Sequence, residues 1–271
     1  WTPRRAAVDS CDISSDVHVT SPLPPAISPA PLPRARLVAL AVWPTLAFVV
    51  LFGLMQETGF DAWVAARFHD TVLGGFPLRD NFWASQVMHE GAREVLVAFA
   101  VAILALWLLS WPMRALRSRR KSLAYLLVAI LLSVVAVHQG KQWTNVDCPW
   151  SVTEFGGQQP HLGLFEDKPD SLPRGYCFPG GHSSGGFALL AFYFVGYGRR
   201  AHTWPLLIPG LLTGSVFAVD QWMRGAHFPS HDLSSAYLCW MIALGTYAWF
   251  YRHERAAARA RNPHPLERPI G

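Results

Sequence analysis

Long apolar stretches are the feature that most constrains how this chain can fold. An α-helix rises about 1.5 Å per residue, so roughly 20 residues are needed to cross the hydrocarbon core of a bilayer. Six stretches approach or reach this length, at residues 37–55, 92–111, 123–139, 185–198, 204–219 and 233–251. Charged residues make up 15% of the chain, against roughly 25% in an average soluble domain. We therefore predict an all-α membrane protein with six transmembrane helices in a bundle, in preference to a soluble protein with unusually apolar helices.

Lysine and arginine gather in a few segments that predict the orientation. These are "RALRSRRKS", "GRRAH", the tail "RHERAAARARN", and Arg34 with Arg36 before the first stretch. Threading six spans puts them all on one side, and short cytoplasmic loops carry the excess of Lys and Arg. We expect a multi-pass protein of a bacterial-type inner (cytoplasmic) membrane with both termini in the cytoplasm. The net charge of +5 then reflects contact with membrane lipids, and we expect no nucleic-acid partner.

The composition also divides the chain into regions. Residues 1–35 are Pro-rich, as in "SPLPPAISPAPLPRAR", and predict a disordered tail. Residues 36–252 form the transmembrane domain, and residues 253–271 form a basic cytoplasmic tail. No apolar core of signal-peptide length precedes the first span, which we expect to act as an uncleaved insertion signal. The segment "FDAWVAARFHD" has helical spacing and predicts a short interfacial helix.

Two cysteines fall in the same loop on the opposite, extracytoplasmic side. Cys148 and Cys177 both lie between the third and fourth stretches. In an oxidising compartment a disulfide between them is plausible, and the alternative is two independent buried thiols.

The segment "PGGHSS" precedes the fourth stretch. Gly180, Gly181 and Ser183 suit a turn whose free backbone N–H groups point outward from the start of a helix, where anions bind. His182 stands in the middle of this segment. Lys141 lies just after the third stretch, where the span meets the outside water and a lysine taken alone is most often a snorkelling anchor.

The segment "RGAHFPSHD" crowds polar groups between the fifth and sixth stretches; these are Arg224, His227, His231 and Asp232. A continuous helix would place Arg224, His227 and His231 on one face with Asp220, but Pro229 predicts a break near His227. Six threaded spans bring the outer ends of the third to sixth stretches to one surface. Two cations, an amide nest and imidazoles together predict a pocket for a multiply charged oxyanion such as phosphate, without a required metal.

Three motifs resemble those of the type 2 phosphatidic acid phosphatase superfamily in order and spacing. They read "KQWTNVDCP", "PGGH" and "DQWMRGAHFPSHD", and the resemblance covers roughly residues 36–252. The family patterns are Lys, six residues, Arg-Pro; Pro-Ser-Gly-His; and Ser-Arg, five residues, His, three residues, Asp. The departures are Cys148 for the first Arg, Gly180 for Ser, Asp220 and Gln221 for Ser-Arg, and His231 for Asp with Asp232 beside it.

The resemblance implies a role for each matching residue. His227 is the expected nucleophile, which forms a phosphohistidine, and His182 is the expected general acid and base. Lys141 and the N–H of Gly181 are expected to bind phosphate. Asp232 is expected to orient His227, with His231 as the competing choice.

Two arginines are candidates to replace the missing motif residues. Arg224 lies one helical turn after Gln221, and Arg174 lies in the loop "LPRGYC". A solvated loop arginine is the alternative for Arg174. We expect a structural or interfacial role for His89.

The function implied is a membrane phosphatase that hydrolyses a lipid phosphate or pyrophosphate at an extracytoplasmic active site, without a cofactor. Three alternatives stay open: transfer of phosphate from lipid to lipid, non-catalytic binding or transport of a lipid phosphate, and a metal hydrolase that uses His227 and His231.

Overall fold

The computed structural model describes residues 32–196 and 203–261, and within these ranges the protein is all helical, without a β-strand. The α-helices are α1 (Arg34–Thr58), α2 (Phe60–Phe68), α3 (Ala92–Leu109), α4 (Arg114–Arg117), α5 (Arg120–Thr144), α6 (Gly181–Phe187), α7 (Phe192–Gly196), α8 (Ile208–Met223), α9 (Pro229–Phe250) and α10 (Arg252–Arg261). A π-helix, η1 (Trp83–Gly91), leads into α3. The 3-10 turns are η2 (Pro149–Ser151), η3 (Thr153–Phe155), η4 (Ala188–Ala191) and η6 (Trp204–Leu207).

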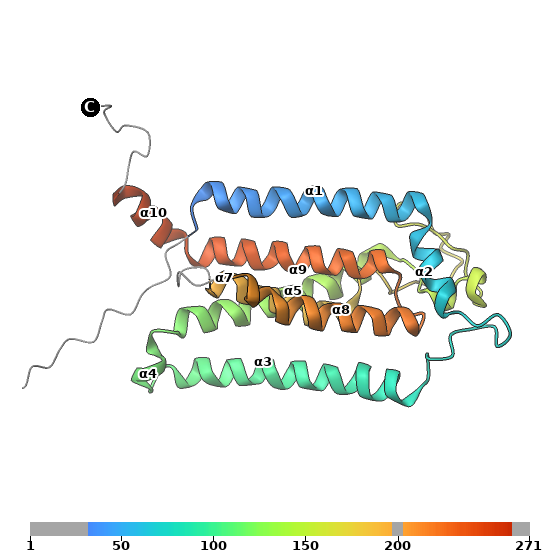
Figure 1. The fold of residues 1–271 in the computed structure, drawn as a ribbon, viewed down its shortest axis with the longest axis horizontal. Coiled ribbons are helices and arrows are strands. Elements are labelled where there is room, and N and C mark those ends of the chain that lie inside the picture. The colour runs from blue at the N-terminus through green and yellow to red at the C-terminus, as the bar shows by residue number, and fades with distance from the viewer. Residues whose placement is uncertain (1–31, 197–202, 262–271) are drawn as a thin grey trace, which may run out of the picture.

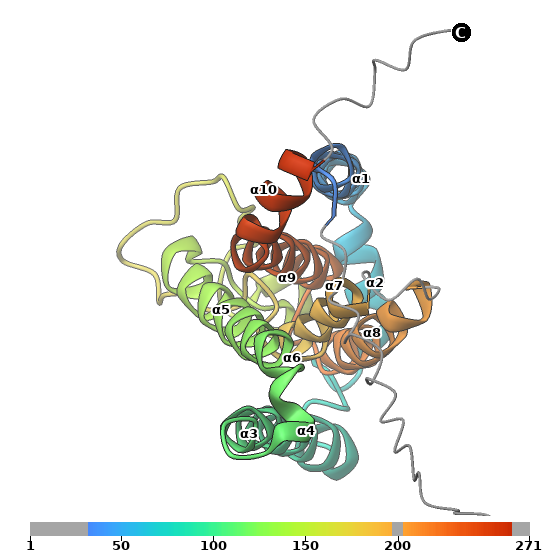
Figure 2. The same cartoon turned by 90° about the vertical axis from the view of Figure 1, so that its left-hand side faces the viewer.

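The long helices run alongside one another as a bundle (Figure 1). Helices α5, α8 and α9 occupy its middle, and α1 and α3 lie on opposite outer sides (Figure 1, Figure 2). The short run α6–η4 packs against α5, α8 and α9. The inner layer is therefore built from helices that begin at residue 120 or later, with α1 and α3 outside it.

Helix α1 shows why this bundle needs a lipid environment. None of its residues is buried, and apolar side chains such as Trp43 (71% exposed) and Val49 (59% exposed) point outward. Within the described ranges, four helical segments are long and apolar enough to cross a membrane: Arg34–Thr58, Trp83–Leu109, Arg120–Ser151 and Trp204–Met223. Lipid tails cover such surfaces without the cost that water imposes. The prediction of an all-α protein is confirmed for the described residues, and four of the six predicted spans correspond to helices that could cross a membrane.

The fourth and sixth predicted spans differ from the other four. The fourth is broken into α6, η4 and α7, and its last two residues lie outside the described ranges. The sixth corresponds to α9, whose first turn holds His231 and Asp232. Both runs pack inside the bundle, where small and polar residues are tolerated because neighbouring helices replace lipid. Residues 1–31 of the predicted tail lie outside the described part, and α10 continues into the predicted basic tail.

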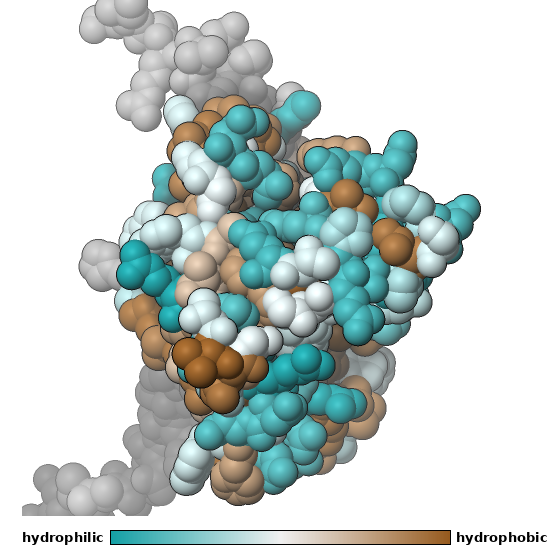
Figure 3. All heavy atoms as spheres, turned by 90° about the vertical axis from the view of Figure 1, so that its right-hand side faces the viewer, coloured by the Kyte–Doolittle hydropathy of each residue, from teal (hydrophilic) through white to brown (hydrophobic). Residues whose placement is uncertain are grey.

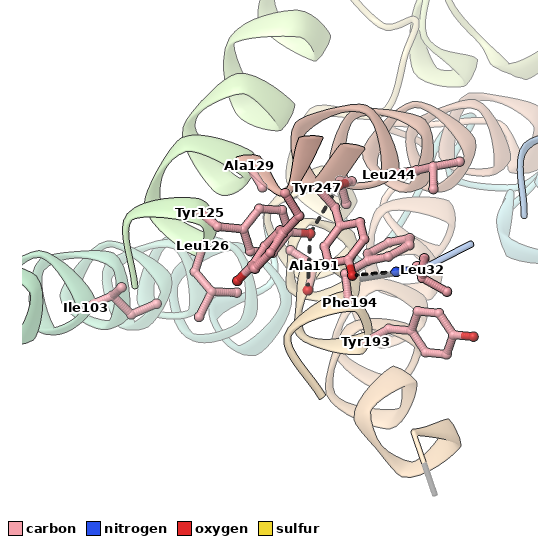
Figure 4. Packing of buried hydrophobic residues seen from close by; sticks show 12 residues of the cluster. Leu32, Ile103, Tyr125, Leu126, Ala129, Ala191, Tyr193, Phe194, Leu244 and Tyr247 are labelled. Carbon is pink, nitrogen blue, oxygen red and sulfur yellow. Dashed lines mark hydrogen bonds between the residues drawn. The ribbon is translucent and has the colours of Figure 1, made fainter. Parts of the chain in front are cut away.

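The inner layer has one aromatic centre at the end of the bundle that carries α4 and α10. Tyr125 of α5 is fully buried, and its hydroxyl lies 3.1 Å from the carbonyl oxygen of Ala243 and 3.3 Å from that of Ala191 (Figure 4). These carbonyls belong to α9 and η4. One hydroxyl therefore holds three elements together around the rings of Tyr247 and Phe194.

Glycines bring α6 and α8 into close contact. A Cβ atom added to Gly186 would lie 2.4 Å from the backbone nitrogen of Gly214, and one added to Gly214 would lie 2.3 Å from the ring of Phe187. Small residues at a helix interface allow such approach of two backbones. This contact sets the position of α6 along α8, and the first turn of α6 carries His182.

We expect Gly186→Ala to destabilise the fold by about 1–3 kcal/mol, because the new methyl group overpacks a backbone contact. Gly245→Ala in α9 is the matched control, since a Cβ there meets no atom within 4 Å. Thermal unfolding in detergent, followed by tryptophan fluorescence, measures both. Equal melting temperatures for the two variants would contradict the packing argument.

Candidate functional site

Chain segments from across the sequence meet at the end of the bundle that carries α2. Figure 3 shows this end as mainly hydrophilic. The loop between α5 and α6 covers part of it and is tied down by a disulfide between Cys148 and Cys177, whose Cα atoms are 5.2 Å apart. Lys168 and Asp147 add a buried ion pair at 2.5 Å. The disulfide also means that Cys148, at the position of the first-motif arginine, contributes no free side chain to an anion site.

The centre of the site is a buried pair formed by His227 and Asp232. The Nδ1 atom of His227 lies 2.9 Å from Oδ1 of Asp232, and the two side chains are 6% and 2% exposed. Asp232 also accepts hydrogen bonds from the hydroxyl of Ser183 at 2.5 Å and from Nε1 of Trp222 at 2.7 Å. Because the carboxylate accepts at Nδ1, the lone pair of the neutral imidazole lies on Nε2.

The turn before His227 explains how this pair is positioned. Helix α8 ends at Met223, and Gly225 adopts a left-handed conformation with φ 69°. A side chain there would also strike Phe76, whose ring lies 2.3 Å from the added Cβ. The continuous helical face considered for residues 220–231 is therefore absent, because the chain breaks at Gly225, before the proline.

The next helix starts with Pro229 at its first position, where the missing N–H costs nothing. Asp61 of α2 accepts the N–H of Ser230 at 2.9 Å. A carboxylate from another helix thus caps α9, since an anion is favourable at a helix N-terminus. This cap anchors the turn that holds Asp232.

Gly180 packs against the pair of His227 and Asp232, and Gly181 packs against Lys141. A Cβ on Gly180 would fall 2.1 Å from Oδ1 of Asp232, and one on Gly181 would fall 2.8 Å from Cε of Lys141. The N–H of Gly180 donates to the carbonyl oxygen of His231 at 2.9 Å, so it is already used. Lys141 Nζ donates to the carbonyl oxygen of Tyr176 at 3.0 Å.

Two cations lie close to the nucleophile candidate. Burial is the main cause that lowers the pKa of His227; Asp232 acts in the opposite direction, and the positive charges of Lys141 and Arg224 lower the pKa further. Arg224 is 9% exposed, and its Nε donates to the carbonyl oxygen of Arg79 at 3.2 Å. His227 is therefore neutral near pH 7 and lies between two positively charged groups.

His182 lies beside His89, for which the sequence predicts a structural or interfacial role. The Nε2 atom of His182 donates to the carbonyl oxygen of Met88 at 3.2 Å, and its ring lies 4.4 Å from that of His89, centroid to centroid. The amide nitrogen of Gln221 donates to Asp220 at 2.6 Å and lies 3.3 Å from Nδ1 of His89. His89 thus belongs to the site. The sequence feature that could have indicated this is the position of His89 just before the second predicted span, at its outer end.

The remaining predicted site residues do not take part in the hydrogen bond between His227 and Asp232. His231 packs its ring against Phe178 and Phe228, with ring centroids 5.3 and 5.4 Å away, and lies 6.1 Å from the ring of His227. Arg174 is exposed and stands over the ring of Tyr176 at 5.8 Å. The hydroxyl of Ser183 is directed to Asp232. Among residues 32–196 and 203–261, no three His, Cys, Asp or Glu side chains are placed to hold one metal ion.

Histidines, a carboxylate and two cations thus lie together at one end of the helix bundle, and a comparison with known families indicates the class of the protein. The model of the PAP2 superfamily matches residues 122–255. Over these residues the chain belongs to that superfamily, as the three motifs predicted. Membership indicates phosphatase-type activity on phosphate esters. No curated protein and no solved structure matched the chain.

We expect Gly180→Ser, which restores the residue of the family motif, to disrupt the site. The added Cβ would collide with Asp232 Oδ1 and lie 3.0 Å from Nδ1 of His227. The unfolding free energy should fall by about 1–3 kcal/mol, as measured by thermal and denaturant unfolding in detergent. Gly75→Ser is the control, because no atom lies within 4 Å of a Cβ there. A Gly180→Ser protein as stable as wild type would contradict this geometry.

Proposed function

We propose that this protein is a membrane phosphatase that hydrolyses a lipid phosphate or pyrophosphate through a phosphohistidine intermediate. The observation that carries the proposal is the buried hydrogen bond between His227 and Asp232, which leaves the lone pair on Nε2 for attack. With the basic segments on the cytoplasmic side, the site faces outward, at the periplasmic surface of a bacterial-type inner membrane.

The chemistry needs two steps. Nε2 of His227 attacks phosphorus in line, the bond from phosphorus to the ester oxygen breaks, and the leaving oxygen takes a proton from His182. Water then attacks the phosphohistidine and gives a proton to His182. The bond between nitrogen and phosphorus breaks, phosphate leaves, and both histidines return to their first state.

The hydrogen bond to Met88 decides which nitrogen of His182 transfers the proton. Since a carbonyl oxygen can only accept, Nε2 carries hydrogen and Nδ1 is the exchanging atom. Burial, followed by the neighbouring His89, lowers the pKa of His182 to about 4. A substrate phosphate brings negative charge to the ring and favours the imidazolium, so substrate binding itself prepares the acid.

Lys141 and Arg224 supply the positive charge that phosphoryl transfer requires, because positioning and charge stabilisation carry most of this catalysis. Arg224 is buried beside the histidines and takes the place of the motif arginine that Gln221 replaces. Arg174 is exposed, and we assign it no part in the phosphate cage.

An apolar groove beside the site supports a lipid substrate. It has a volume of about 490 Å³ and runs between η1 and α8, with Trp83, Met88 and Val216 among its walls. Asp220 and Met88 join it to the site, since the carbonyl of Met88 holds His182. A lipid tail in this groove would stay in hydrocarbon while its phosphate reaches His227.

The proposal is tested by phosphate release from purified protein, with EDTA present, on phosphatidate, undecaprenyl pyrophosphate and a soluble aryl phosphate. We expect release from the lipids, and a loss of about 10³-fold or more in His227→Asn because the nucleophile is gone. Acid-labile phosphate should label the wild-type protein and not the variant.

Four outcomes would overturn parts of this proposal. Wild-type turnover by His227→Asn removes the nucleophile assignment. Activity abolished by EDTA favours a metal hydrolase. Tight binding of lipid phosphate without release or transfer favours a binder, and transfer to an alcohol acceptor instead of water favours a phosphotransferase.

We expect Asp232→Asn to lower kcat by about 10²–10⁴-fold, because the amide no longer fixes the imidazole in the reactive tautomer. Asp232 raises the pKa of His227, so its removal should shift the acid limb of the kcat/KM profile to lower pH. His231→Gln is the comparison, with an expected change of less than about fivefold. A large loss in His231→Gln, with little in Asp232→Asn, would move the orienting role to His231.

A further inference from the structure

We propose a second ligand site, for the head group of an anionic phospholipid, at the end of the bundle opposite the histidines. It lies where α3 ends, α5 begins and α9 passes into α10 (Figure 1, Figure 2). The cavity there has a volume of about 500 Å³. This proposal does not depend on the proposed phosphatase activity.

Positive charge surrounds the cavity. Its basic lining residues are Arg117, Arg120, Lys121, Arg252 and His253, and none of the described lining residues is acidic. Lys121 forms an ion pair with Glu254. In the part of the chain that the structure describes, Arg117, Arg120 and Arg252 form no ion pair with a carboxylate. The cavity therefore has an excess of positive charge that an anion would balance.

Tryptophans frame the same cavity. The guanidinium of Arg120 lies 4.2 Å from the ring of Trp111, and that of Arg252 lies 5.0 Å from the ring of Trp249. These two indoles are 61% and 59% exposed. Stacking of this kind holds a guanidinium in place. Arg120 already donates from Nε and Nη2 to Ser110, and Arg252 donates from Nε to His253. Their remaining guanidinium N–H groups are the donors for an anion. Exposed indoles at the end of a membrane-crossing helix are typical of the lipid head-group region.

The combination favours a lipid over a free anion. Trp107, Ala124 and Phe250 add apolar surface to the basic rim, which a phosphodiester carrying acyl chains would cover and inorganic phosphate would leave bare. Basic pockets between transmembrane helices on the cytoplasmic side recognise anionic head groups in this way. The ligand should therefore carry both a phosphodiester and its acyl chains.

The test uses the full chain in detergent micelles, with lipid binding measured by native mass spectrometry and by thermal shift. Phosphatidylglycerol is the probe, and phosphatidylcholine, glycerol phosphate and inorganic phosphate are the comparison ligands. We expect phosphatidylglycerol to bind most tightly, and Arg117→Gln with Arg252→Gln to weaken it about tenfold or more.

The matched control is Arg114→Gln with Arg119→Gln, which removes the same charge at the same end, outside the cavity. Equal weakening by both pairs would reduce the site to general attraction for anionic lipid and overturn the proposal. Equal binding of phosphatidylcholine, or of glycerol phosphate or inorganic phosphate, would also overturn it. If the double variant unfolds at a lower temperature without lipid, the single variant Arg117→Gln, which changes an exposed side chain, carries the test under the same criteria.

Discussion

The carboxylate of Asp232 is the interaction on which the rest of the site depends. It accepts hydrogen bonds from Ser183 in α6, from Trp222 in α8 and from His227 in the turn before its own helix. A buried carboxylate without such donors would be costly, so its burial requires all three elements to stay in place. The same bonds that stabilise the charge therefore fix the imidazole that we propose as nucleophile.

The departures from the family motifs make sense together around this carboxylate. The acid lies one residue later than the family pattern, and its oxygen then occupies the space beside Gly180 where a side chain would stand. In this structure, only glycine leaves room for the carboxylate at this position. The hydroxyl of Ser183 still reaches the carboxylate from the next turn. His231, at the family's acid position, is left to pack between aromatic rings.

The sequence predicted the helices well and the local breaks poorly, for a physical reason. Apolar length alone indicates a membrane helix, so α1, α3, α5 and α8 were evident. Threading six spans predicted that the outer ends of the third to sixth stretches would meet. The end of α8 depends on the left-handed conformation of Gly225 and on contact with Phe76, which periodicity does not encode. The position of His89 depends on the π-helix η1, whose extra residue per turn turns the side chain toward His182.

The bundle also separates its tasks by layer. The family match covers residues 122–255, which hold the inner helices and the proposed catalytic groups, while α1 and α3 lie outside it. Helix α3 joins the site through η1, which provides the carbonyl of Met88 and one wall of the apolar groove. Its other end provides Trp107 to the basic cavity. Helix α3, with η1 before it, therefore borders both the apolar groove and the basic cavity, one at each end. The proposed substrate entry and the proposed head-group site both lie beside this one outer helix.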